Sequence, residues 1–328
     1  MKSITLKAKP LDMETGRHIV VLHEHDAEEL GHFAGDRVQL ATPTAKLVAI
    51  ANTTKRMVQK GEVGAVIEVT EALGLKPGDI LSVMLVPRPR SVDFIKKKMS
   101  GQQLKTEEIY AIVDDITAMN LSSVEMSAFV VGEVIQGMTT SEIVALTRRM
   151  VSTGDRLELN ISPVLDVHSI GGVPGNKYAL VAVPIVAAAG LVVPKTSSRA
   201  ITSAAGTADV MEVLANVTLG MDEIKRIVQK VGAVLAWGGA VRLAPADDII
   251  IGVERTLGVD PRCQLLASLM SKKLAVGADR ILIDIPTGPG AKVESMDEAR
   301  SYAHDFMELG HRLDVQVEVA VTYGGQPV

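Results

Sequence analysis

The chain has 328 residues, of which 47% are hydrophobic and 22% charged, a composition typical of a globular protein with more than one domain. Its 34 basic and 39 acidic side chains leave a net charge of −5, which argues against binding to nucleic acid or to an anionic membrane by electrostatics. One cysteine excludes an intrachain disulfide, and the first residues lack the apolar core of a signal peptide. We therefore expect a cytoplasmic protein with no membrane segment.

The first 158 residues change from a strand pattern to a helix pattern. Residues 1–87 contain short β-like runs such as KLVAIANTT and DILSVMLV between Gly, Pro and Asp turns, and they predict a small N-terminal β domain. The prolines of PRPR interrupt this pattern. In the following segment Ile109, Ile112 and Ile116 recur at helical spacing, and Ser141 is a candidate cap for the next helix. Residues 88–158, together with 245–277, are predicted to form a helical domain.

From about residue 159 strand and helix signals alternate. The runs PVLDVHS, LVVP, AVLAWG, RILIDI and VQVEVAV predict strands, and helical segments separate them. This alternation predicts an α/β fold, with a mixed, mainly parallel sheet in a phosphate-binding domain over 159–244 and 278–328. The chain stops at VTYGGQPV, directly after a strand, so we expect this domain to lack its C-terminal part.

Three polar loops follow predicted strands of the α/β region. They are HSIGGVPGN at 168–176, TSSRAITSAAGTADVME at 196–212 and PTGPGAK at 286–292. Parallel strands direct their carboxyl ends at one crevice, and glycines and helix starts can bind an anion there. The bland alternative for the first two loops is a compact turn, which in the first loop would leave His168 hydrogen-bonded within the protein. Thr207 is suited to cap the helix that follows the second loop.

One helix and its entry, VDPRCQLLASLMSKKLAVG, add further candidates. Ser268 and Lys272 are four residues apart and share a face, whereas Lys273 is expected to be solvated and Cys263 to lie in the core. Asp260 precedes a proline, which is typical of a helix N-cap. Hydrogen bonds at a cap favour the ionised carboxylate, and this argues against Asp260 as a proton donor. The two alternatives for Asp260 at this point are a helix cap and a proton donor.

These motifs carry a resemblance to a known family. SSRAITSAAGTADVMEVL, LDVHSIGGV, LAPADD with LLASLMSKKLAVGAD, and IPTGPGAK resemble successive blocks of the thymidine and pyrimidine-nucleoside phosphorylases, from about residue 91 to the end. The extra residues 1–87 and the form VHSIGGVPGNKYAL are most similar to the archaeal AMP phosphorylases of that family. The resemblance implies that a nucleoside 5′-monophosphate (AMP, also CMP and UMP) and phosphate react to give free base and ribose 1,5-bisphosphate.

The resemblance also implies the residues of the site. Asp260 is the expected proton donor, and the expected nucleotide and phosphate contacts are Gly172, Ser198, Arg199, Ala200, Ile201, Thr202, Ser203, Thr207, Ser268 and Lys292. We expect no metal and no cofactor, and inorganic phosphate is the expected co-substrate. The expected partners are the nucleotide and phosphate, without nucleic acid or membrane, in a homodimer or larger homo-oligomer.

Two departures bear on specificity. The lysine before His-Ser in the thymidine enzymes is Val167 here, and the arginine that contacts the pyrimidine aligns near Val253. Both changes favour a base pocket different from that of the thymidine enzymes, and a substrate that carries a charged group on its sugar. The alternatives are a thymidine or pyrimidine-nucleoside phosphorylase, a phosphoribosyltransferase that resembles anthranilate phosphoribosyltransferase, and a non-enzymatic module built around residues 1–87. The transferase would need an aspartate after Gly-Gly, and HSIGGVPG has none.

Overall fold

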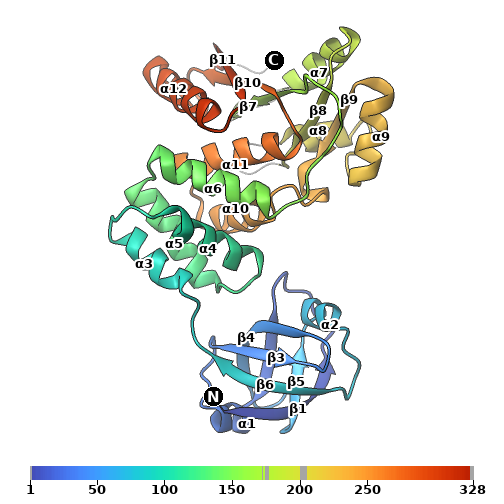
Figure 1. Ribbon diagram of the computed structural model, residues 1–328, viewed down its shortest axis with the longest axis vertical. Helices are drawn as coiled ribbons and strands as arrows, with labels where there is room; N and C mark the ends of the chain where they lie inside the picture. Colours follow the sequence, from blue (N-terminus) through green and yellow to red (C-terminus); the bar gives the residue numbers. More distant parts are fainter. Residues whose placement is uncertain (1, 172, 174–176, 200–204, 326–328) are drawn as a thin grey trace. The chain divides into compact units, whose positions relative to one another are not determined.

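The computed structural model describes residues 2–171, 173, 177–199 and 205–325 of the chain. Contacts divide the chain into two compact units, one of residues 1–94 with 115–126 and one of residues 95–114 with 127–328. Figure 1 shows a barrel of strands in the first unit, and helices with an α/β part in the second. The α/β fold with a helical domain and a small β domain, predicted from the sequence, is confirmed.

The first unit is built on a closed β-barrel with the strand order β1-β5-β2-β4-β3-β6. The strands are β1 Ser3–Pro10, β2 Ile19–His23, β3 Arg37–Ala41, β4 Lys46–Thr54, β5 Glu62–Ala65 and β6 Ile80–Val86, with the short helices α1 Glu24–Leu30 and α2 Ile67–Leu73. Alternate residues such as Val20 with Leu22 and Val38 with Leu40 are fully buried and form the core of the barrel. Closure pairs the strand edges that an open sheet would leave free.

The helical part of the chain consists of six helices. They are α3 Ser91–Met99, α4 Thr106–Thr117, α5 Ser123–Gln136, α6 Thr140–Ser152, α10 Pro245–Leu257 and α11 Arg262–Ala275. The predicted cap at Ser141 is wrong, because Thr139 precedes α6 and its hydroxyl accepts a hydrogen bond from the Glu142 N–H. The Glu142 carboxylate accepts one from the Thr139 N–H in return, so the glutamate three residues on selects the threonine as cap.

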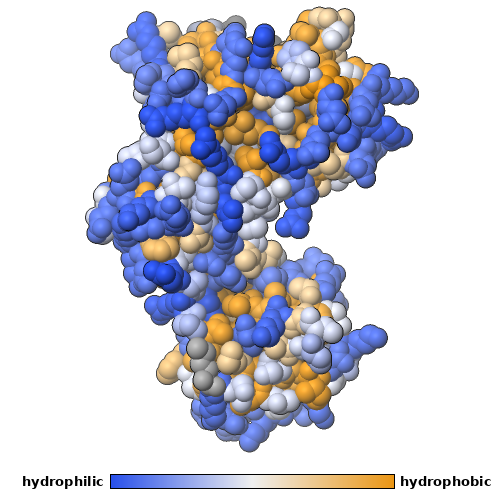
Figure 2. All heavy atoms as spheres, in the orientation of Figure 1, coloured by the Kyte–Doolittle hydropathy of each residue, from blue (hydrophilic) through white to orange (hydrophobic). Residues whose placement is uncertain are grey.

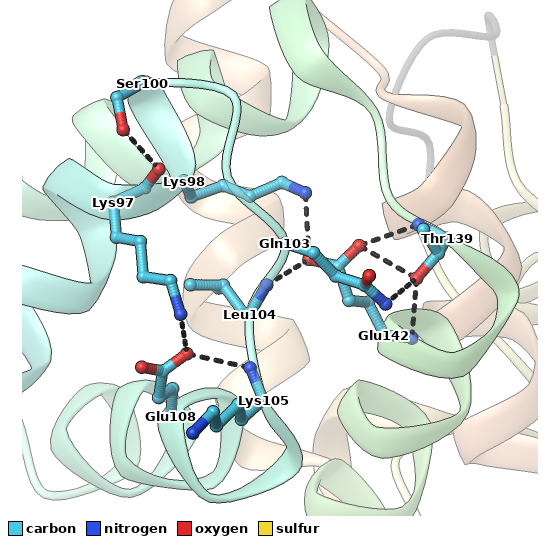
Figure 3. Close-up of polar contacts among 9 residues, drawn as sticks. All are labelled: Lys97, Lys98, Ser100, Gln103, Leu104, Lys105, Glu108, Thr139 and Glu142. Carbon is cyan, nitrogen blue, oxygen red and sulfur yellow. Dashed lines mark hydrogen bonds and ion pairs between the residues drawn. The ribbon is translucent and has the colours of Figure 1, made fainter.

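Glu142 also holds together three segments of the helical part (Figure 3). Its buried carboxylate accepts hydrogen bonds from Lys98 at 3.0 Å and from the Leu104 N–H at 2.9 Å. Burial tends to raise the pKa of Glu142, but the hydrogen bonds from Leu104, Thr139 and Lys98 outweigh burial and lower it. The ionised carboxylate therefore joins the end of α3, the loop before α4 and the start of α6.

The α/β part contains two parallel sheets. One has the order β11-β10-β7 and the other pairs β8 with β9. The strands are β7 Leu165–Ser169, β8 Val193–Ser197, β9 Ala233–Trp237, β10 Arg280–Thr287 and β11 Gln316–Tyr323. A single parallel bridge between Val164 and Val192 connects the starts of β7 and β8, and beyond it the two strands belong to separate sheets. The parallel strands agree with the prediction, whereas the division into two sheets was not predicted.

Helices cover these sheets. They are α7 Tyr178–Ala188, α8 Thr207–Glu212, α9 Met221–Val231 and α12 Met296–Arg312, with a 3-10 turn at Gly238–Ala240. Ala179 and Val183 of α7 pack on Val193 of β8. The opposite side of α7 is apolar but exposed, with Val181 and Ile185 in solvent, and Figure 2 shows hydrophobic surface in this region at the top right. Among the described residues, no helix is long and apolar enough to cross a membrane.

The predicted domain boundaries stay predictions. β6 ends at Val86 and α3 begins at Ser91, on either side of the expected boundary at residue 87. The two compact units, however, divide the chain within α3, α4 and α5, and so they do not test the three predicted domains.

Candidate functional site

A cavity lies at the carboxyl ends of β7 and β8, and we call it the strand-end cavity. Its described lining comes from the ends of β7 and β8 and the loops after them, from the loop after β10, from the starts of α7 and α8, and from α10, α11 and the loop between these two helices. The structure thus brings the described parts of all three predicted polar loops to one place. Six of the expected site residues line the cavity: Ser198, Arg199, Thr207, Asp260, Ser268 and Lys292. The other five lie outside the described residues: Gly172, Ala200, Ile201, Thr202 and Ser203.

β7 brings His168 and Ser169 to the cavity. The Ser169 N–H donates to the Tyr178 hydroxyl over 2.9 Å, which fixes the backbone where the strand enters its loop. Burial holds the pKa of His168 well below its usual value, and the positive charge of Lys273 acts in the same direction. His168 is therefore a neutral imidazole at neutral pH, and it offers hydrogen bonding without a further positive charge.

The polar stretch that begins at Thr196 starts as a strand. β8 pairs with β9 through Ser197, so the predicted strand LVVP begins two residues later than expected and continues into lysine and hydroxyl residues. Lys195 and Thr196 are only 1% and 3% exposed. Backbone pairing with β9 satisfies the main chain whatever the side chains are, and this allows a buried strand to carry polar residues.

Arg199 follows β8 and is oriented by acidic residues of α8. Its guanidinium donates to Glu212 at 2.5 and 2.8 Å and to Asp209 at 3.1 Å. It also lies 4.7 Å from the centre of a Trp237 ring. These contacts hold an arginine at the wall of the strand-end cavity.

Thr207 lines the cavity, but the prediction that it caps α8 is wrong. Gly206 is the N-cap and Thr207 is the first residue of the helix. The Asp209 carboxylate accepts a hydrogen bond from the Gly206 N–H at 2.8 Å, so an acidic residue inside the helix satisfies the helix start. The Thr207 hydroxyl is not required for capping.

Asp247, a residue that sequence reasoning missed, holds two cavity residues in place. It is fully buried at the start of α10, and its carboxylate accepts hydrogen bonds from Gln264 at 3.0 Å and Ser268 at 2.8 Å. The Lys272 ammonium group lies 2.7 Å from the same carboxylate. Ser268 and Lys272 do share a face of α11, as their spacing predicted, and Asp247 fixes both.

The expectation that Lys273 is solvated is wrong. Its ammonium group is 2.9 Å from an Asp166 oxygen on β7 and donates to the Thr196 carbonyl at 3.2 Å. Helix α11 contacts α6, as Figure 1 shows, and also reaches the strand ends, so that more than one of its faces is covered. The side chains at neighbouring positions 272 and 273 can therefore both face the protein, with Lys272 partly buried and Lys273 fully buried. Cys263, expected in the core, is buried.

Asp260 does not cap α11. The N-cap is Pro261, helix α11 begins at Arg262, and the Asp260 carboxylate instead forms an ion pair and hydrogen bond with Lys292. Because Pro261 is the N-cap, Asp260 precedes the cap position and lies outside the helix. The capping reading of Asp260 is therefore wrong, and the objection that it raised against proton donation no longer applies.

Glu254 is a second acidic residue of the cavity that sequence reasoning missed. It is 5% exposed, and its Oε1 has no hydrogen-bond partner among the described residues. Burial, and then the charges of Asp247 and Asp260, raise the pKa of Glu254 to about 8. A sequence signal existed, because Glu254 follows the apolar run IIIGV on a buried helix face. The corresponding signal for Lys195 is a lysine within a strand.

The cavity combines hydroxyls, lysines and an arginine with two carboxyl groups. Such a lining suits an anionic ligand together with a group that exchanges a proton. Within the described residues, no group of three or more His, Cys, Asp or Glu side chains could hold a metal ion.

Comparison with known proteins gives consistent results. Models of the glycosyl transferase family match twice, the helical bundle domain over residues 92–154 and the a/b domain over 162–326. AMP phosphorylase 1 of Archaeoglobus fulgidus and the AMP phosphorylase of Pyrococcus furiosus are each 54% identical over 322 residues, and that of Methanococcus aeolicus is 50% identical over 323. The motif resemblance to archaeal AMP phosphorylases is thereby confirmed. Each alignment covers 98% of this chain, which spans 64% of the length of these relatives.

A solved structure shares the fold. Anthranilate phosphoribosyltransferase from Thermus thermophilus has a TM-score of 0.60 and 24% identity, over 72% of this chain and 68% of that one. At this identity the likeness concerns the architecture, a helical domain beside an α/β domain.

Proposed function

Since this chain belongs to the glycosyl transferase family with its helical bundle and a/b domains, we propose that it is an AMP phosphorylase. In the proposed reaction, phosphate attacks C1′ of a nucleoside 5′-monophosphate, the C1′–N bond breaks, and free base and ribose 1,5-bisphosphate are formed. AMP, CMP and UMP are the proposed substrates. The observation that carries the proposal is the strand-end cavity, where Asp260 lies beside Lys292 among residues suited to bind anions.

The reaction requires two anions to bind near a sugar that gains positive charge. Lys292, Arg199 and Lys272 supply positive charge to the cavity, and Ser198, Ser268 and Thr207 supply hydroxyl groups. Charged hydrogen bonds of this kind bind phosphate groups strongly. Fixed side chains also reduce the entropic cost of aligning phosphate with C1′.

The departing base needs a proton, and Asp260 is the proposed donor. As the C1′–N bond breaks, its electron pair stays on the base nitrogen and takes the proton of the Asp260 carboxyl group. An anion bound at Lys292 offsets the ammonium charge beside Asp260 and so makes it easier for this residue to carry the proton. The released Asp260 carboxylate then attracts Lys292 again.

The alternative enzymes are less well supported. The relatives with about 50% identity are named AMP phosphorylases, whereas the anthranilate phosphoribosyltransferase is a likeness in fold at 24% identity. The replacement of charged residues of the thymidine enzymes by Val167 and Val253 favours a nucleotide over thymidine.

Release of free base tests the proposal. The intact protein is incubated with AMP, CMP, UMP, adenosine or thymidine, with and without phosphate and with and without EDTA. We expect phosphate-dependent release that survives chelation, with kcat/KM for AMP more than tenfold above that for adenosine, or about 1.4 kcal/mol. Loss of activity on chelation would favour the transferase, and equal kcat/KM for AMP and adenosine would contradict nucleotide specificity.

A homodimer or larger homo-oligomer remains part of the proposal. Helix α5 exposes Val134 and Ile135 at 48% and 70%, and apolar side chains gathered on a surface often mark a subunit interface. Light scattering of the intact protein tests this directly, and a monomer at micromolar concentration would contradict it.

A further inference from the structure

Four lysines line the strand-end cavity, and one of them differs from the rest. Three have a carboxylate partner: Lys272 with Asp247 at 2.7 Å, Lys273 with Asp166 at 2.9 Å, and Lys292 with Asp260. The fourth, Lys195, forms no ion pair with a carboxylate of the described residues. Only 1% of Lys195 is exposed, so water does not replace the missing partner.

Lys195 lies against another buried lysine. Its Nζ donates to the Thr196 carbonyl at 3.0 Å, and the Nζ of Lys273 donates to the same oxygen at 3.2 Å. The two amino groups thus share one carbonyl oxygen, and of the two only Lys273 is paired with the Asp166 carboxylate. Two ammonium ions in this arrangement would repel each other in a region that water does not screen.

The surroundings decide which lysine carries the charge. Burial first, and the charge of Lys273 second, lower the pKa of Lys195 well below its usual value, and Asp166 only partly opposes this. The titratable groups that face Lys195 are Lys273 on α11 and Asp166 and His168 on β7. Lys273 lies against the Asp166 carboxylate, whereas Lys195 has no carboxylate of its own, so Lys195 is the amine whose uncharged form is favoured when the cavity holds no anion.

We propose that Lys195 is an anion ligand that takes up a proton from solvent when phosphate binds in the strand-end cavity. This inference rests on the proposed function, because it takes inorganic phosphate as the ligand. A phosphate dianion supplies the negative charge that Lys195 lacks, and the amine then binds a solvent proton and donates a charged hydrogen bond to a phosphate oxygen. The phosphate keeps its own charge, and the only new covalent bond is N–H.

The coupling has a measurable sign. Because the bound state holds one more proton than the free state, phosphate affinity falls as pH rises, between the pKa of Lys195 without phosphate and its higher pKa with phosphate. Full uptake corresponds to a tenfold loss of affinity for each pH unit in this range. A lysine that stays charged in both states gives no such slope.

Calorimetry of inorganic phosphate binding tests the inference. Titrations of the intact protein at about pH 8, where phosphate is mainly a dianion, are repeated in buffers with different ionisation enthalpies. We expect uptake close to one proton for each phosphate in the wild type. In Lys195→Met, which keeps the volume of a buried uncharged side chain, we expect almost no uptake and about 10- to 100-fold weaker binding.

Two control variants test whether the proton taken up binds to Lys195. Lys230→Met removes an exposed lysine of α9 and should leave uptake unchanged. Glu254→Gln removes a second titratable group of the cavity wall, and uptake should persist in this variant.

Uptake that persists in Lys195→Met, or that disappears in Glu254→Gln, overturns the inference. Phosphate binding without uptake in the wild type also overturns it and needs no variant to fold. Absence of phosphate binding in the wild type refutes instead the proposed phosphorolysis, so the two failures are distinguishable.

Discussion

Replacement of Asp260 by asparagine separates its structural role from the proposed chemical one. The structure removes the capping role, because helix α11 begins at Arg262 with Pro261 as its N-cap. What remains is the ion pair with Lys292, whose partners are 26% and 22% exposed. A partly exposed pair of this kind contributes at most about 1 kcal/mol to stability. Asp260→Asn should therefore lower the melting temperature by no more than about 4 °C.

The expected effect on the reaction is much larger. Asparagine keeps the shape of the side chain but cannot donate the acid proton, and general acid catalysis contributes roughly 10²- to 10⁴-fold. This loss corresponds to about 2.7–5.4 kcal/mol at the barrier, several times the structural contribution. The assay measures kcat for AMP with saturating phosphate, together with thermal unfolding. We expect the loss mainly in kcat, because the proton transfer acts in the transition state.

Lys292→Met is the matched control for this experiment. It breaks the same ion pair but leaves the acid in place, so KM should rise while kcat falls less than in Asp260→Asn. A stable Asp260→Asn protein with nearly full activity would refute the assignment of Asp260 as the proton donor.

Three further substitutions test the structure around the cavity. Asp247→Asn removes the charge that fixes Ser268 and Lys272, so KM for AMP should rise at least about tenfold and stability to urea fall by about 3 kcal/mol; changes below twofold in KM would argue against positioning. Glu254 stays protonated in the folded state up to about pH 8 but ionises from about 4.5 when unfolded, so stability is lost as pH rises through this window. Glu254→Gln should therefore gain about 3 to 5 kcal/mol relative to the wild type between pH 4.5 and 8, and parallel stability profiles would contradict the buried neutral acid. In Gly154→Ala the new Cβ would clash with the Leu243 carbonyl oxygen, so urea unfolding should show a loss of at least about 2 kcal/mol, and an unchanged midpoint would contradict this contact.

Local sequence patterns predicted much of the fold but fewer features of the site. Apolar runs bounded by turns identified the strands, because side-chain periodicity reflects the face that each strand buries. It was harder to predict which of two neighbouring helix residues points into the protein. Lys272 and Lys273 both point into the protein, since α11 is covered on more than one face, and no pattern within the helix reveals that.

Helix ends show the same limit. Three hydroxyl residues, Thr139, Thr140 and Ser141, were available at the start of α6, and the partner glutamate selects Thr139 as the cap. At α11 the Asp260 carboxylate pairs with Lys292 from a distant loop, and this contact cannot be read from the Asp-Pro sequence. Likewise, the ionisation of Glu254 and Lys195 depends on burial and on charges that come from other elements. Glu254 and Lys195 were therefore among the site residues that sequence reasoning missed.

The central claim is that phosphate itself attacks the nucleotide sugar. Incubation of the intact protein with AMP and oxygen-18-labelled phosphate, followed by mass spectrometry of the sugar product, tests this claim most directly. We expect ribose 1,5-bisphosphate in which the C1′ phosphate retains all of its label, including the oxygen bonded to the sugar, together with an equal amount of adenine. Unlabelled ribose 5-phosphate, or a sugar pyrophosphate that forms only with pyrophosphate and magnesium, would contradict the account.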